Sequence, residues 1–542
     1  MYFPSLYNRT MEHDFNIDIH CHSSWKPFMS GRNNPSHTPF ESYENEISAR
    51  ILKWLSKKIE GKLHFKLSTQ SNFDNLHKGK VRVAIVALTP LEKAFFVVNV
   101  KSDGLFKKIM KGLVAEKKMS NMFTLKNNVV NALTGFHTTD IDFSKTWMSQ
   151  YFQEALVPEY TYFTKYNNQQ NKDETYTIKF VKNFQEIKEA VHTGSTTICI
   201  IISIEGAHTL SSQVPETDHL MQHAGKTHLE DGLDANSLLA YENNIEAMKK
   251  WEFVPLYISL NHHFWNGLGG HAKSLTKIFD TLVSQTEGMN EGLKTMGKEV
   301  IKLLLKTSNG PRVLIDIKHM SPACRKDFYS FIQTNYWMHN DKFPLICSHT
   351  GVVSKCRTLD ALIVQNDEME GHDTSNFLHE QSINLCAEDI IVIFETDGLI
   401  GIQLDERRIA GNIVITIVKK NRKLTSADLR RQYAKIVFAN LFEIVKTVNS
   451  KKGWDLLCIG SDYDGFIHHL DFYPTTAEIP ILKKDLFEFL IQPEEISQTG
   501  FNYSIQLDEI KRLMFGLTAG EIIQKIFSGN AMNFLQKNFN RQ

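Results

Sequence analysis

The sequence has no excess of charge of either sign. Its 542 residues include 61 lysines and arginines and 61 aspartates and glutamates, so the formal net charge is zero. Proteins that bind nucleic acids or anionic membranes by electrostatic attraction normally carry a strongly basic surface. The balance argues against both kinds of partner, and we expect a small molecule as the substrate.

Long apolar runs are also missing. The longest, from Ile198 to Ile204, contains a serine and is far shorter than the about 20 residues of a membrane-spanning helix. The first residues, MYFPSLYNRTMEHDFNIDIHCH, lack the basic, apolar and small-residue regions of a secretory signal. The seven cysteines are odd in number and scattered, a pattern typical of reduced thiols. We therefore expect a cytoplasmic protein with no membrane contact.

Glycine and proline are scarce. The 29 glycines and 14 prolines make up about 8% of the chain, against about 12% in average proteins. This excludes collagen-like and Pro/Gly-rich disordered chains, and the 42% of hydrophobic residues suffices for a large core. The length alone would allow three or four domains of about 150 residues, but one α/β barrel with insertions can exceed about 400 residues.

Eight short runs rich in β-branched residues recur along the chain, and each precedes a longer stretch of helical or mixed pattern. This order is typical of parallel strands joined by crossover helices. The runs are residues 15–22, 81–88, 197–205, 253–261, 312–319, 343–349, 399–405 and 455–462. They predict an α/β fold, a (β/α)8 TIM barrel, with residues 1–542 as a single domain.

The connections after the first three strands are longer than a barrel needs. They comprise residues 23–80, 89–196 and 206–252. Since the loops after barrel strands form the rim above the active site, we expect these insertions to be rim or lid elements.

Helical connectors are visible in three places. Apolar periodicity predicts helices over residues 289–306 and 426–447, and Ser426 is the expected N-cap of the second. The same periodicity over residues 518–536 predicts a closing helix near the C-terminus.

Histidines and carboxylates gather at the ends of the predicted strands. His20 and His22 lie two residues apart, so their side chains point to the same side of the first strand. The other such residues are Glu205, His208, His262, His319, His349 and Asp462. One histidine alone is more often a packing residue, but strand ends of a barrel converge on one rim. Imidazole with carboxylate suits Zn, Mn, Fe or Ni, and the set predicts a divalent metal centre.

Six motifs, in this order, resemble those of the renal (membrane) dipeptidase family, peptidase family M19 of the amidohydrolase superfamily. They are DIHCH at 18–22, IEGAH at 204–208, YISLNHH at 257–263, LIDIKHMS at 314–321, CSHTG at 347–351 and IGSDYDG at 459–465. The resemblance covers nearly the whole chain except the insertions. It implies an amidohydrolase-type barrel with two divalent metal ions, zinc first, with Fe, Mn or Ni as alternatives.

The resemblance also implies a set of metal ligands. The resemblance implies that Glu205 bridges the two ions. A shared carboxylate lowers the repulsion between two cations. The other ligands it implies are His20 and His22 on one ion, His319 and His349 on the other, and Asp462.

Catalytic roles follow from the same resemblance. It implies that His262 polarises the substrate carbonyl and that Asp462 handles the proton. Amide hydrolysis requires both functions, because the carbonyl must be activated and the leaving amine must be protonated. For His208 two interpretations stay open, a partner that positions Glu205 or a plain loop residue.

The chain departs from the family at His22, where the family usually has aspartate. A neutral ligand there leaves the centre more positive, and we expect a more electrophilic centre. A substrate carboxylate would need a cation nearby, for which Arg357 matches the family's arginine with shorter local spacing. Arg407 and Arg408 are the alternatives.

The sequence therefore predicts a metal-dependent hydrolase that cleaves the amide bond of a dipeptide or a similar small molecule. One alternative keeps the metal centre and changes the substrate to another amide, a lactone or an ester. A second is a noncatalytic ligand-binding barrel. Such barrels are often dimers, so a homodimer is possible. No patch in the sequence identifies its interface.

Overall fold

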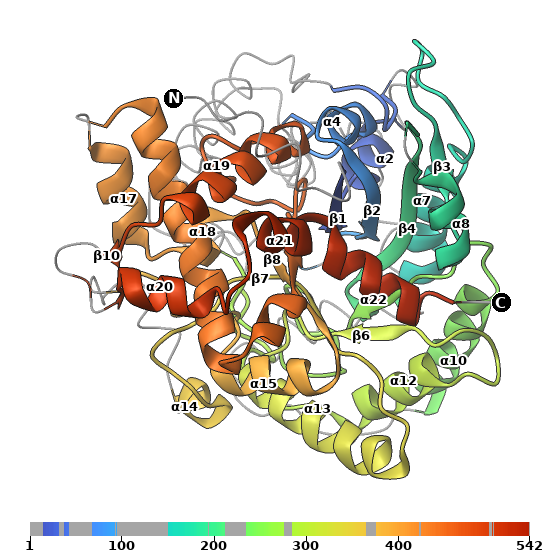
Figure 1. Ribbon diagram of the computed structural model, residues 1–542. Helices are drawn as coiled ribbons and strands as arrows, with labels where there is room; N and C mark the ends of the chain where they lie inside the picture. The colour runs from blue at the N-terminus through green and yellow to red at the C-terminus, as the bar shows by residue number, and fades with distance from the viewer. Residues whose placement is uncertain are drawn as a thin grey trace, which may run out of the picture.

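The computed structural model describes residues 15–31, 37–42, 68–92, 94, 150–192, 194–211, 235–275, 284–364, 376–421, 424–497, 501 and 503–540. Figure 1 shows the strands in the interior of the described structure, with the helices around them. Eight parallel strands form a nearly closed barrel, which confirms the predicted (β/α)8 fold.

All eight predicted strands are present and pair in chain order. They are β1 (Asn16–Cys21), β2 (Val81–Leu88), β4 (Ile198–Glu205), β5 (Tyr257–Ser259), β6 (Leu314–Asp316), β7 (Ile346–Thr350), β8 (Leu399–Ile402) and β9 (Leu457–Ile459). Nearly every strand residue is buried, because side chains fill the barrel interior and helices cover its outside.

The barrel closes between its first and last strands, just beyond their carboxyl ends. The backbone N–H of Asp462 donates to the carbonyl of His20, and that of His22 donates to the carbonyl of Tyr463, both at 2.9 Å. Cys21 and Tyr463 form a parallel bridge. The seam of the barrel therefore lies at the rim where the predicted site residues gather.

A ninth strand, β3 (Ile178–Phe180), was not predicted. It pairs in parallel with the first residues of β4, whereas β5 pairs with Ile204 and Glu205 at the other end of the same strand. The three residues of β3 are too few to give a recognisable alternating pattern.

The three predicted insertions are described only in part. They contain α2 (Trp25–Gly31), α4 (Phe73–Lys78), the π-turn η2 (Phe152–Leu156), α7 (Val157–Thr164), β3, α8 (Phe184–Ala190), the 3-10 turn η3 (Ala207–Leu210) and α10 (Ala235–Lys249). Their other residues lie largely outside the described ranges. Their role as rim or lid elements, and the assignment of residues 1–542 to one domain, stay predictions.

Helices follow the later strands. They are α12 (Thr295–Leu305), α13 (Pro322–Asn335), α14 (Leu359–Val364), α15 (Ala387–Glu395), α16 (Glu406–Ile409), α17 (Asn412–Lys420), α18 (Ser426–Val448), α19 (Ile479–Ile491), α20 (Leu507–Leu513), α21 (Ala519–Gln524) and α22 (Asn530–Asn538). A small hairpin, β10 (Ile496–Ser497) and β11 (Ser504–Ile505), follows α19. Among the described helices, none combines the length and apolar character that crossing a bilayer requires.

The predicted helix boundaries need correction. Helix α12 begins at Thr295 rather than near residue 289, because Asn290 has a left-handed φ of 64°, which a helix does not accommodate. The N-cap of α18 is Thr425, whose hydroxyl accepts from the N–H of Asp428, and Ser426 is the first helical residue. The closing helix is divided into α21 and α22 by the π-turn η8 (Lys525–Gly529).

Candidate metal centre and active site

The barrel strands bring the predicted ligands to one buried point at their carboxyl ends. His20, Glu205 and His349 lie in the last residues of β1, β4 and β7. His22, His262, His319 and Asp462 lie one to three residues beyond the ends of β1, β5, β6 and β9. Residues up to 442 positions apart in the chain, His20 and Asp462, therefore face one another.

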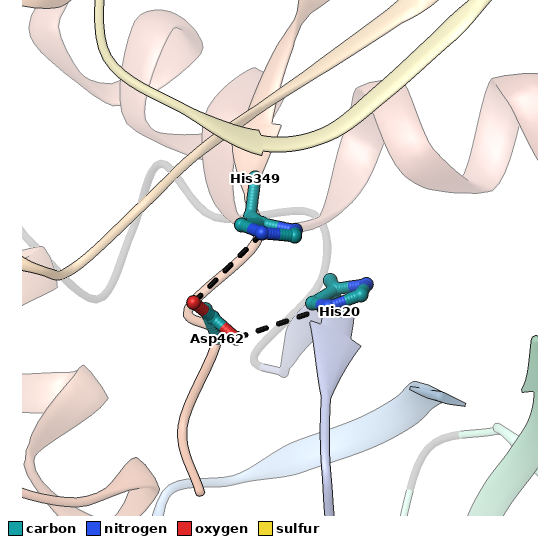
Figure 2. A group of neighbouring side chains, drawn as sticks. All are labelled: His20, His349 and Asp462. Atoms are coloured by element: carbon teal, nitrogen blue, oxygen red, sulfur yellow. Dashed lines mark ion pairs between the residues drawn. The ribbon is translucent and has the colours of Figure 1, made fainter. Parts of the chain in front are cut away.

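Three groups of these residues place their ligand atoms within 4.8 Å of one another. The groups are His20, His22 and Glu205; Glu205, His319 and His349; and His20, His349 and Asp462. Figure 2 shows the third group, with the Asp462 carboxylate facing both histidines. The rings of His20 and His349 stack with centroids 4.1 Å apart.

Glu205 lies at the centre of the cluster, and its two oxygens face different imidazoles. The nitrogens near Oε1 are the Nε2 atoms of His319 (3.1 Å), His349 (3.5 Å) and His20 (3.6 Å). Those near Oε2 are the Nε2 atoms of His22 (3.3 Å) and His262 (3.5 Å). This is the arrangement that a bridging carboxylate needs.

The far nitrogen of His20 is fixed by Tyr257. The Tyr257 hydroxyl donates to the carbonyl of Ile19 at 2.6 Å, so its oxygen accepts from Nδ1 of His20 at 3.0 Å. The proton on Nδ1 leaves Nε2 with a free lone pair. Nε2 is buried without a hydrogen-bond partner among the described residues, and it faces the centre.

His349 is oriented in the same way. Its Nδ1 lies 2.9 Å from the Ser348 hydroxyl, which itself donates to Asp316 at 2.7 Å. The hydroxyl therefore accepts from Nδ1, and Nε2 of His349 also presents a lone pair.

Asp18 repeats the role of Asp316 on the opposite side of the barrel. Its carboxylate accepts from the N–H of Ser461 at 3.0 Å, from the Ser461 hydroxyl and from the N–H of His20 at 3.2 Å. In both cases an aspartate in one strand binds a serine near the end of the neighbouring strand. This serine directly precedes a site residue, His349 in one case and Asp462 in the other. Asp462 and His319 have left-handed φ values of 60° and 68°, and such strain persists only where surrounding contacts fix it.

The protonation states suit metal binding. Burial lowers the pKa of His319 to about 3 and holds the pKa of His349 well below its usual value, so both imidazoles are neutral. Burial alone would raise the pKa of Glu205, but the surrounding histidines hold it well below its ordinary value. Neutral imidazoles, an ionised carboxylate and the buried unpartnered Nε2 of His20 together fit a divalent cation.

His262 is held by a residue that the sequence analysis did not single out. Its Nδ1 lies 3.0 Å from the Glu92 carboxylate, which also accepts from the N–H groups of His263 at 2.7 Å and Phe264 at 3.2 Å. Burial would lower the pKa of His262, but the charges of Glu92 and Glu205 outweigh it and raise the pKa to about 9. The imidazole of His262 is therefore a hydrogen-bond donor at neutral pH.

His208 lies beside His262 and not against Glu205. Its Nε2 lies 3.1 Å from the carbonyl of Pro90, and its ring is parallel to that of His262 with centroids 6.2 Å apart. The backbone turns toward it at Gly206, which has a φ of 96°. A Cβ there would lie 2.4 Å from the His208 ring. This geometry matches neither of the two interpretations, because His208 packs behind His262.

A cavity with about 550 Å³ of empty space, part of it open to solvent, opens above the cluster. Besides the residues of the centre, its lining includes Lys318, Gln403, Arg407 and Arg408. Gln403 donates to Asp462 at 2.6 Å, and burial lowers the pKa of Lys318 to about 8. Arg357 is exposed and does not line this cavity, whereas the alternatives Arg407 and Arg408 do.

The comparisons with known proteins give structural matches only. No protein-family model and no curated protein matches the sequence. One similar solved structure is a dipeptidase of metallopeptidase family M19, with 10% identity, 97% of this chain and 99% of that chain covered, and a TM-score of 0.47. A probable dipeptidase, PvdM, from Pseudomonas aeruginosa has 12% identity, 99% and 100% coverage and a TM-score of 0.43.

A third match is a metallopeptidase from Rhodobacter sphaeroides bound to a phosphinate mimic of the dipeptide L-Ala-D-Ala. It has 10% identity, covers 97% of this chain and 100% of its own, and has a TM-score of 0.42.

Proposed function

We propose that the protein is a metal-dependent hydrolase that cleaves the amide bond of a dipeptide or a similar small molecule. The observation that carries this proposal is the Glu205 carboxylate, whose two oxygens face separate sets of histidines in one buried cluster. Two ion positions sharing this carboxylate would account for that arrangement. We infer a binuclear centre of zinc or, alternatively, Fe, Mn or Ni.

The residues that would hold the ions are His20, His22, Glu205, His319, His349 and Asp462. When bound, divalent ions lower the pKa of water to near neutrality and polarise a carbonyl oxygen. Tyr257 and Ser348 keep the ligand nitrogens of His20 and His349 free of protons.

His262 and Asp462 supply the proton chemistry. His262 donates from Nε2 toward the substrate carbonyl oxygen, while Glu92 fixes its other nitrogen. Asp462 accepts the proton that the attacking water loses and returns it to the leaving amine, and Gln403 holds its second oxygen. All these groups line the same cavity or lie directly behind it.

The experiment combines metal analysis with a substrate panel. The chain loaded with Zn²⁺ is assayed on glycine and alanine dipeptides, N-acyl amino acids, lactones and esters. We expect dipeptide hydrolysis that stops on chelation and returns with added metal. Preference for lactones or esters would assign another substrate class to the same centre.

A matched pair of histidine variants tests the metal ligands. His319→Ala should lose bound metal and activity together. His77→Ala, a change of a half-buried histidine on α4, should keep both. Full activity without metal, or an unchanged His319→Ala enzyme, would overturn the proposal.

We also propose that the protein works in the cytoplasm. All seven cysteines carry free thiols, and six of them are buried. Reduced thiols are typical of a cytosolic environment.

A further inference from the structure

Lys318 is a buried cation that none of the described residues neutralises. It lies between Asp316, the last residue of β6, and the ligand His319, and only 2% of its side chain is exposed. Its Nζ has no hydrogen-bond partner and no ion pair among the described residues. Removing an ammonium group from water without a partner is costly, so a group of this kind requires an explanation.

The Lys318 side chain lines the cavity above the cluster together with two other cations, Arg407 and Arg408. Arg407 forms an ion pair with Asp405 at 2.7 Å. Arg408 donates to the side-chain oxygen of Gln381 at 2.5 Å and to the carbonyl of Ser274.

None of the acidic residues that line the cavity forms a hydrogen bond with Lys318. Asp405 is occupied by Arg407, and Glu205 and Asp462 face the histidines of the cluster. Metal ions at the cluster would be bound by Glu205 and Asp462. Their positive charge would make the cavity more positive. The lining is therefore arranged for a ligand that brings a negative charge of its own.

We propose that Lys318 binds a free carboxylate of the substrate, so that the site selects amides that carry one. This inference rests on the proposed hydrolase function. Because Lys318 directly precedes the ligand His319, the carboxylate it binds lies close to the reacting amide. In a dipeptide a single Cα separates the terminal carboxylate from the amide nitrogen, so a short substrate meets this requirement.

The test compares Lys318→Met, which removes the charge and keeps the length, with Lys318→Arg, which keeps the charge. The substrates are glycylglycine and glycylglycinamide, which differ only in the terminal carboxylate. For Lys318→Met we expect KM for glycylglycine to rise about 10- to 100-fold with little change in kcat or metal content. KM for glycylglycinamide should not change, and Lys318→Arg should recover part of the loss.

A second substrate pair distinguishes the two possible positions of the carboxylate. N-succinylglycinamide carries it on the acyl side of the amide, and N-acetylglycinamide carries none. A loss for Lys318→Met that is confined to either carboxylate-bearing substrate supports the proposal and identifies the side. An equal loss for charged and neutral substrates, or no loss, overturns it.

Binding without turnover separates this proposal from the proposed function. Calorimetric titration with N-acetylglycine and N-acetylglycinamide measures the carboxylate contribution even if the enzyme hydrolyses none of the substrates. Wild-type protein should bind the first more tightly, and Lys318→Met should abolish the difference. Equal binding of both probes to wild type overturns the proposal.

Lys249→Met is the matched control. Lys249 is also buried, but its Nζ donates to the carbonyl of Lys306 and to Asn309 at 3.3 Å, away from the cavity. This variant should melt at a lower temperature with unchanged KM values. Lys318→Met should melt at a higher temperature than wild type, because it removes an unpaired buried charge.

Discussion

At the scale of single residues, the groups behind the ligands decide what the ligands can do. A histidine can present either nitrogen with or without a proton, and the hydrogen bond on its far side selects the form. Tyr257 makes this selection for His20, and Ser348 with Asp316 makes it for His349. These two contacts therefore leave Nε2 of both histidines free to accept a cation.

Tyr257→Phe should weaken metal binding by about 10- to 100-fold, the usual cost of losing a residue that orients a metal ligand. The variant leaves Nδ1 of His20 buried without its acceptor and allows the proton to move to Nε2. Competition with a calibrated chelator measures the affinity.

Tyr329→Phe is the control for that measurement. It removes a buried hydroxyl that donates to Asp389 at 2.8 Å, between α13 and α15. This change should lower stability and leave the metal affinity as it is in wild type. Equal affinities for the two variants would contradict the role assigned to Tyr257.

The clustering of the candidate ligands was predictable at this scale, and the residues that support them were not. His20, Glu205, His319 and His349 lie at or near the ends of β-branched runs, and barrel geometry then places them together. Glu92 lies four residues beyond β2, and its contact with His262 depends on how the loop folds back. A single sequence contains no local signal for such a contact.

At the scale of elements, the ends of the helices depend on individual side chains. Helix α18 begins with a capping box, in which Thr425 and Asp428 bond each other's backbone N–H groups. Either Thr425 or Ser426 could start this helix by residue type alone. The structure assigns the capping role to Thr425.

Thr425→Ala should lower the free energy of unfolding by about 1 kcal/mol, since it removes the acceptor for the Asp428 N–H. Ser426→Ala, one residue later, should change it by a few tenths of a kcal/mol or less, because alanine is favourable inside a helix. Urea denaturation of both variants gives the comparison. If Ser426→Ala lowered the free energy of unfolding more than Thr425→Ala, Ser426 would be the N-cap, as the sequence predicts.

Strands were easier to predict than helix boundaries. The eight barrel strands have compact apolar runs, whereas β3 has only three residues and α12 is shortened by the left-handed Asn290. Such effects depend on one or two residues, and periodicity over a long window averages them away.

At the scale of the whole molecule, the candidate ligands hold the two sides of the barrel seam together. His20 belongs to the first strand and His22 directly follows it, and Asp462 follows the last strand. Backbone hydrogen bonds already join these segments, and bound ions would add links between their side chains.

Removing metal should therefore lower the melting temperature. An ion at 1,000 times its dissociation constant stabilises the folded state by about 4 kcal/mol. Calorimetric scans with and without chelator measure the shift, and readdition of Zn²⁺ should reverse it. The His319→Ala variant should respond much less, and an equal response would place the stabilising ions elsewhere.

The overall topology was predictable because eight strand and crossover units leave few other arrangements. No comparable rule predicts the structure of the three insertions. Their described parts combine helices, a strand and turns, and no repeated unit relates these elements to one another.

The seam also fixes when this site can come into existence during protein synthesis. Ribosomes deliver His20 before the other candidate ligands and Asp462 after all of them, 442 residues later. A nascent chain that stalls before the eighth strand carries several histidines but lacks the complete pocket. A chain that terminates before Asp462 therefore leaves the ribosome without the full set of candidate ligands.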